Sequence, residues 1–249
     1  MRLHLINGNS TAAMTEQALR RARAVAAPST GVFASTPAAG PSSVEGYYDG
    51  ALAVPGILEA IRRAEAEGAV AAHIIACFDD PGLDAARSMA RAPVVGMCEA
   101  AILVARSLAG NFAIVTDLPA SVPPLEKLLL NYGAARNCRR IRVADAPVLA
   151  LASGEADARG LVAAEIARAL AEEKPEAIIL GCASLCDLSG TLTDEFNLPV
   201  IDGIGAAVVW GEALARLGLC TSRAGGYALP GAKIYRGILA PWSPREESS

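Results

Sequence analysis

The sequence predicts an α/β protein made of two pseudo-symmetric, Rossmann-like domains with parallel sheets and an active site in the interdomain cleft. Short apolar runs alternate with helical patterns along the chain, which is typical of βαβ units. Apolar residues make up 53% of the 249 residues and charged residues 19%, a composition that suits buried parallel strands. One pattern also occurs twice: a strand ends on a cysteine, at Cys77 and Cys182, and a later strand begins with proline, at Pro93 and Pro199. The repeat predicts a duplicated unit.

The first half of the chain carries four expected strands and four expected helices. The segment 36–50 is rich in Pro, Gly and Ser and contains Tyr47 and Tyr48. Its length predicts a functional loop such as a lid. The strands are expected over 2–6, 31–34, 70–76 and 94–96, and the helices over 14–27, 52–67, 82–89 and 99–108.

The second half repeats this order. Val115-Thr116 matches Ile6-Asn7, as Cys182 matches Cys77, so the halves agree at two points. We expect one domain over 1–97 with 206–249 and another over 98–205, with a frayed end near Glu247. Strands are expected over 112–115, 139–143 and 177–180 and from Pro199, and helices over 124–132, 155–173 and 203–217, with a short helix after Cys182.

Charge and hydropathy argue against a membrane-spanning or nucleic-acid-binding protein. No apolar run reaches the roughly 18 residues needed to cross a bilayer, and the N-terminus lacks the features of a signal peptide. The net charge is −4, and no basic cluster with interleaved aromatic residues indicates nucleic-acid binding. We therefore expect a cytoplasmic protein whose partner is a small molecule, not nucleic acid or membrane. We also expect a homo-oligomer, although the sequence does not set its size.

The cysteines do not form a pattern typical of a metal site. Six cysteines in a cytoplasmic chain are expected to be reduced. Cys182 and Cys186 have helical spacing, but zinc needs further Cys or His ligands close by. The only histidines, His4 and His73, fall inside expected strands. We therefore expect no metal.

Four polar residues stand at the ends of expected strands: Asn7, Cys77, Thr116 and Cys182. In open parallel sheets, ligands bind beyond the carboxyl ends of the strands, so these residues are expected to converge on one cleft. Backbone N–H groups after each cysteine could bind an anionic oxygen and lower the thiol pKa. A single cysteine at a strand end is more often a small buried apolar residue, but the matched pair favours two functional thiols.

Several blocks of sequence carry a family resemblance, and the block from Cys77 to Leu83 is the most specific of them. In order, from Leu3 to about Leu217, the chain resembles the hydantoin racemase branch of the aspartate/glutamate racemase superfamily. The blocks are Ile6-Asn7-Gly8-Asn9-Ser10-Thr11, Ala76-Cys77-Phe78-Asp79-Asp80-Pro81-Gly82-Leu83, Pro93-Val94-Val95-Gly96, Gly181-Cys182-Ala183 and Pro199-Val200-Ile201-Asp202-Gly203.

The resemblance implies two-base proton transfer without a cofactor. One of Cys77 and Cys182 would remove a proton from the stereogenic carbon as a thiolate, and the other would protonate the opposite face as a thiol. A 5-substituted hydantoin is the expected substrate, because its ring carbonyl and amide make the C–H acidic. The resulting enolate needs hydrogen-bond donors. The expected substrate-binding residues are Asn7, Ser10, Phe78, Asp79, Thr116, Asp117, Ala183, Ser184, Asp202 and Gly203.

Two departures from the family pattern bear on the substrate. Asp117 stands where relatives commonly have a second threonine, and Ser184-Leu185 stand where they often have Gly-Met. Allantoin therefore stays open as a substrate, as do an amino-acid racemase, a maleate-type cis-trans isomerase and a non-catalytic bilobal binding protein. Asn7 and Ser10 could equally cap the following helix, and Asp202 could be a cap as well.

Overall fold

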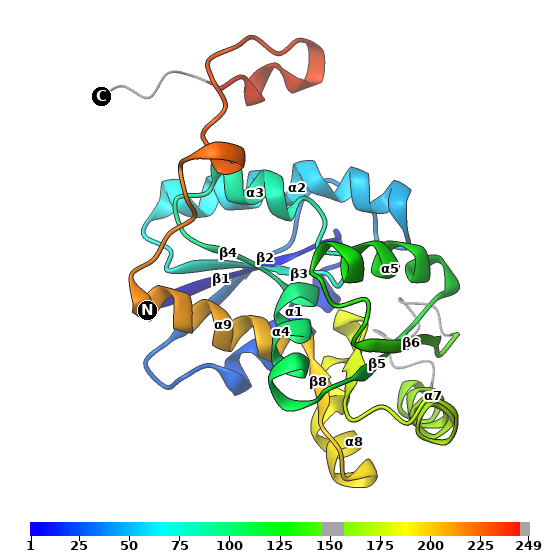
Figure 1. Cartoon of the computed structure of the whole chain (residues 1–249). Helices are drawn as coiled ribbons and strands as arrows, with labels where there is room; N and C mark the ends of the chain where they lie inside the picture. Colours follow the sequence, from blue (N-terminus) through cyan, green and yellow to red (C-terminus); the bar gives the residue numbers. More distant parts are fainter. Residues whose placement is uncertain (146–156, 245–249) are drawn as a thin grey trace.

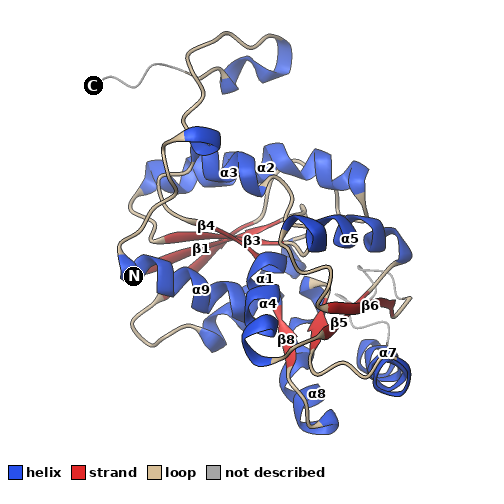
Figure 2. Ribbon diagram, viewed as in Figure 1, coloured by secondary structure: helices blue, strands red, loops and turns tan. Residues whose placement is uncertain are grey.

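Two four-stranded parallel sheets form the framework of the protein (Figures 1 and 2). The computed structural model describes residues 1–145 and 157–244. Sheet A has the order β2-β1-β3-β4, and sheet B has the order β6-β5-β7-β8. The equal order of the two sheets confirms the duplicated α/β architecture. The strands are β1 (Arg2–Asn7), β2 (Gly31–Ser35), β3 (Ala72–Ala76), β4 (Val94–Gly96), β5 (Phe112–Thr116), β6 (Cys138–Val143), β7 (Ile178–Leu180) and β8 (Val200–Asp202).

Helices cover both faces of sheet A, with α2 and α3 on one face and α1 and α9 on the other (Figure 1). No helix in the described part of the chain is long and apolar enough to cross a membrane. The helices are α1 (Ala12–Val25), α2 (Tyr47–Glu67), α3 (Leu83–Met89), α4 (Met97–Leu108), α5 (Val122–Asn131), α7 (Ala158–Glu172), α8 (Ser189–Phe196) and α9 (Gly203–Leu217), with short 3-10 turns η1 (Pro119–Ser121), η2 (Ala183–Leu188), η3 (Gly225–Tyr227) and η4 (Gly237–Trp242).

The two sheets share an apolar core. Helices α4 and α9 pack against each other, and each also contacts strands of both sheets. Their fully buried residues Met97 and Ile204 belong to one cluster that also contains Leu5 of sheet A and Phe112 of sheet B. Burying this apolar surface is the main favourable contribution to holding the halves together.

The expected elements agree with the observed ones to within two residues at each end, except at two helix starts. Helix α2 begins at Tyr47 and not at Leu52. The backbone turns into the helix at Gly46, whose φ of +106° favours glycine. The loop is therefore residues 36–46, and both tyrosines lie exposed in the first turn of α2. The helix expected from residue 155 is described from Ala158, and residues 155 and 156 lie outside the described residues, as does Glu247.

Candidate active site

Cys77 and Cys182 line the same cavity. In sheet A, Asn7 of β1 pairs with Ala76 of β3, and Cys77 follows directly. In sheet B, Val115 of β5 pairs with Leu180 of β7, and Cys182 follows two residues later. The cavity measures about 30 Å³. Its walls are Asn9, Met14, Val44, Ala76, Cys77, Phe78, Asp79, Asp117, Ser121, Gly181, Cys182 and Ala183.

The loop of residues 36–46 contributes Val44 to the cavity wall. The Ser10 hydroxyl donates to the Pro41 carbonyl at 3.1 Å, and the Thr11 hydroxyl donates to the Ser42 carbonyl at 2.7 Å. A volume of about 30 Å³ holds no more than a water-sized molecule. A ring-sized ligand therefore requires this loop to move.

Two glycines allow the chain to approach the thiols. A Cβ on Gly8 would lie 2.6 Å from the Cβ and 3.2 Å from the Sγ of Cys77. A Cβ on Gly181 would lie 2.9 Å from Ile114 Cγ2 and 3.1 Å from Thr116 Cβ. Any larger residue at either position would displace the segment that carries a thiol.

Burial raises the pKa of both thiols in this conformation. Burial raises the pKa of the Cys77 thiol well above its usual range, and the Asp79 carboxylate raises it further. Burial likewise raises the pKa of Cys182, and the Asp117 carboxylate adds to it. The N–H groups of Asp79 and Ser184 lower these pKa values, as the sequence suggested, but desolvation outweighs them. Burial therefore disfavours a thiolate at either cysteine in this conformation.

Two carboxyl groups face the cavity. Burial and the charge of Asp117 raise the pKa of Asp79 to about 7. Asp117 is 3% exposed and accepts hydrogen bonds from the Leu118 N–H at 2.9 Å and the Thr116 hydroxyl at 3.1 Å. The departure from the family pattern at Asp117 thus places a carboxylate against Cys182.

A second hollow of about 280 Å³ lies beside the cavity and shares Asp79 with it. The start of α2 and the helix α5 form its other walls, which include Tyr47, Lys127 and Asn131. Its walls therefore combine a carboxyl group, an ammonium group and an amide.

Several residues expected to bind substrate lie outside the cavity wall. Asn7 donates to Asn9 and Thr15, both at 2.9 Å, and supports the turn that carries Asn9. Ser10 holds the closing loop. Thr116 donates to Asp117 and to the Gly181 carbonyl. The Ser184 hydroxyl is buried and has no hydrogen-bond partner among the described residues.

Asp202 and Gly203 also lie outside this wall. Asp202 accepts a hydrogen bond from the Gly205 N–H at 2.6 Å, which makes it the N-cap of α9, and forms an ion pair with Arg21 at 2.7 Å. Gly203 packs against Met97, from which a Cβ would be only 2.4 Å away. The sequence left two roles open for Asp202, a substrate-binding residue or a helix cap. The structure shows it as the cap.

Sequence reasoning assigned no catalytic or binding role to six wall residues: Asn9, Met14, Val44, Ala76, Ser121 and Gly181. Asn9 stands two residues beyond a strand end, a signal that could have found it. Val44 carried no signal, because the path of a loop depends on tertiary contacts. The histidines lie elsewhere, buried in sheet A with their Nδ1 atoms 3.0 Å apart. No group of three potential metal ligands occurs within residues 1–145 and 157–244.

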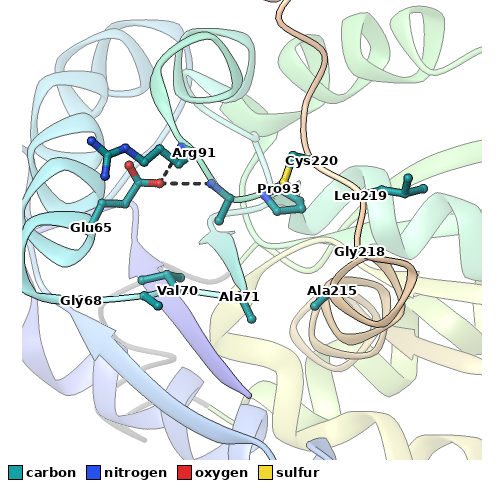
Figure 3. A pocket seen from close by; sticks show the side chains of 12 residues that line it. Glu65, Gly68, Val70, Ala71, Arg91, Pro93, Ala215, Gly218, Leu219 and Cys220 are labelled. Atoms are coloured by element: carbon teal, nitrogen blue, oxygen red, sulfur yellow. Dashed lines mark hydrogen bonds between the residues drawn. The ribbon is translucent and has the colours of Figure 1, made fainter. Parts of the chain in front are cut away.

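A separate groove of about 580 Å³ lies at the opposite edge of sheet A (Figure 3). Ala71 and Pro93 stand before β3 and β4, so this groove is at the amino ends of these strands. Glu65 accepts hydrogen bonds there from the N–H groups of Arg91 and Ala92. The groove does not reach Cys77 or Cys182.

Residues 3–210 match the model of the Asp/Glu/Hydantoin racemase family. A hydantoin racemase of Rhizobium meliloti is 49% identical over 95% of this chain and 98% of its own. The structure of an allantoin racemase from Klebsiella pneumoniae is 44% identical, with a TM-score of 0.95 over 98% of this chain and all of its own. The allantoin racemase structure from Pseudomonas fluorescens is 34% identical, with a TM-score of 0.90 over 95% of this chain and 100% of its own.

Replacing Asp117 should make Cys182 more acidic. Asp117→Asn keeps the size of the side chain but removes the charge that raises the Cys182 pKa. The alkylation rate of Cys182 by neutral iodoacetamide, followed by mass spectrometry, should rise about 3- to 10-fold at pH 8, and its pH midpoint should move down. Asp194→Asn, on the exposed face of α8, is the control. An unchanged or higher midpoint in Asp117→Asn would contradict this electrostatic assignment.

Proposed function

Because the chain belongs to the Asp/Glu/Hydantoin racemase family and is therefore an isomerase of the racemase type, we propose that it racemises 5-substituted hydantoins by proton transfer between Cys77 and Cys182, without a cofactor. One observation carries this proposal. The two thiols come from equivalent strand ends of two sheets with the same strand order, and both line one cavity. Two acid-base groups on different sides of a carbon are what inversion requires.

In one direction, the Cys77 thiolate takes the proton from C5 of the ring, and the C–H electron pair moves into the neighbouring carbonyl to form an enolate. The Cys182 thiol then gives its proton to the opposite face, and the enolate electrons form the new C–H bond. Cys77 ends as a thiol and Cys182 as a thiolate. The opposite enantiomer reacts with the roles reversed.

The backbone supplies stabilisation for both charged species. The N–H groups of Asp79 and Ser184 already lower the pKa of the neighbouring cysteines. N–H groups fixed in advance beside the ring carbonyl stabilise negative charge as it develops on oxygen. The acidity of a hydantoin C5–H keeps the required stabilisation modest.

We assign one domain to residues 1–97 with 206–249 and the other to residues 98–205. Sheet A lies in the first range and sheet B in the second, which supports this division. Helix α9 packs on β3 and α1, in keeping with a return of the chain to the first domain. The two cysteines then stand on different domains.

Allantoin is a second candidate substrate, favoured by the polar hollow beside the cavity. A ureido group on C5 would place N–H donors near Asp79 and a carbonyl near Lys127. An alkyl substituent would leave these charged groups without partners. Two solved structures similar to this chain are of allantoin racemases.

Replacing either cysteine should abolish racemisation. Cys77→Ser and Cys182→Ser each remove one of two acid-base groups, so kcat for racemisation of a 5-substituted hydantoin should fall at least about 100-fold. Polarimetry measures the loss. Cys220→Ser, at an exposed cysteine, is the control and should keep the wild-type rate. Wild-type rates in both active-site variants would rule out the two-thiol mechanism.

A lysine variant separates the two substrates. Lys127→Ala should lower kcat/KM for allantoin about tenfold, the effect of losing a charged hydrogen bond, and change kcat/KM for 5-isobutylhydantoin less than twofold. Lys174→Ala, at an exposed residue just beyond the end of α7, is the control. Equal effects on both substrates would remove the argument for allantoin.

A further inference from the structure

The same turn follows each of the two cysteines. The residue three positions after the cysteine donates its N–H to the cysteine carbonyl, at 3.1 Å after Cys77 and 3.2 Å after Cys182. The third residue of the turn is Asp79 in one half and Ser184 in the other, and its N–H lowers the pKa of the cysteine in both. The duplicated turns therefore agree in their backbone and differ at this position, where one carries a carboxyl group and the other a hydroxyl group.

The Ser184 hydroxyl in the second turn has no hydrogen-bond partner among the described residues. Ser184 is 7% exposed, and bulk water does not reach the hydroxyl oxygen. A buried hydroxyl without a partner is unfavourable, which points to an acceptor that forms in another state of the site. Ser184 lies outside the cavity wall, and this disfavours a bound ligand as that acceptor.

The Cys182 sulfur becomes such an acceptor when it loses its proton. A hydrogen bond from the thiol to the Asp117 carboxylate raises the Cys182 pKa, because it stabilises the protonated form. The Ser184 hydroxyl lowers the same pKa, because a hydroxyl that donates to sulfur stabilises the thiolate. The other titratable groups on the cavity wall are Cys77 and Asp79, both just beyond β3. Cys182 therefore has an acceptor for its proton in Asp117 and a donor for its charge in Ser184.

Helix α1 of the other half fixes the turn that carries this hydroxyl. The Gln17 side chain donates to the Ser184 carbonyl at 3.0 Å and to Asp187 at 3.3 Å. One turn further along α1, Arg21 forms its ion pair with Asp202. The charged side chains of α1 and η2 at this point are thus engaged with other residues. The serine keeps its place while the thiol beside it changes its protonation state.

We propose that the Ser184 hydroxyl donates a hydrogen bond to the Cys182 thiolate and thereby supports this half of the acid-base pair. Ser184 acts through Cys182 and is a positioning residue, in place of the substrate contact expected from the sequence. The Asp79 carboxylate, at the equivalent place in the first turn, opposes ionisation of Cys77. The catalytic importance of this hydrogen bond rests on the proposed two-thiol function, but its existence does not.

Alkylation of Cys182 by neutral iodoacetamide, followed by mass spectrometry, tests the hydrogen bond without any substrate. Ser184→Ala should slow this alkylation about 3- to 10-fold at pH 8 and raise its pH midpoint by about one pH unit, because the thiolate loses a charged hydrogen bond. Alkylation of Cys77 in the same samples reports access to the cavity and should change less than about twofold.

The matched control is Ser189→Ala, at a second buried serine just beyond η2. The Ser189 hydroxyl does have partners, since it donates to the Cys186 carbonyl and to Asp202, both at 3.3 Å. Ser189→Ala should therefore lower the melting temperature by about 2 to 4 °C and leave the Cys182 midpoint unchanged. Ser184→Ala removes a hydroxyl that lacks a partner beside the thiol, so its melting temperature at pH 6 should not fall.

An unchanged Cys182 midpoint in Ser184→Ala would overturn the proposal, as would an equal shift of that midpoint in Ser189→Ala. A lower melting temperature of Ser184→Ala at pH 6 would also overturn it, because the hydroxyl would then have a structural partner. Polarimetry of the wild type keeps this result apart from the proposed function. A raised midpoint in Ser184→Ala, found together with no racemisation by the wild type, would retain the hydrogen bond and contradict only the hydantoin reaction.

Discussion

The parallel register within each sheet is the constraint on which the site depends. Pairing of Asn7 with Ala76 and of Val115 with Leu180 brings equivalent strand ends to the same edge of each sheet. Because the sheets have the same strand order, β3 and β7 occupy equivalent places, and a cysteine follows each: Cys77 directly after β3, and Cys182 after Gly181. The shared core of α4 and α9 fixes the two sheets relative to each other, so that the thiols line one cavity.

Desolvation explains how the closed site differs from a reactive one. Burial and nearby carboxylates raise the pKa of both thiols, more than the neighbouring N–H groups lower them. The loop of residues 36–46 contributes to this burial through Val44. Movement of this loop would admit both substrate and water, which favours ionisation of a thiol. Substrate entry and ionisation of a thiol would both follow from this movement.

The sequence predicted the strands well, because proline and glycine mark their ends and their apolar runs are short. It predicted the cysteine pair and the acid at Asp117 for the same reason, since each follows a strand end. It could not predict the thiol pKa values or the contribution of Val44, because both depend on what covers the site.

The central claim is that two different residues donate and remove the proton. The most direct test incubates one enantiomer of a 5-substituted hydantoin with the wild-type protein in deuterated buffer and follows deuterium at C5 of both enantiomers early in the reaction. With two bases, newly formed product should carry deuterium while the remaining substrate keeps its hydrogen. Substrate that exchanges its hydrogen as fast as product forms would contradict it, because a single base would then handle both protons.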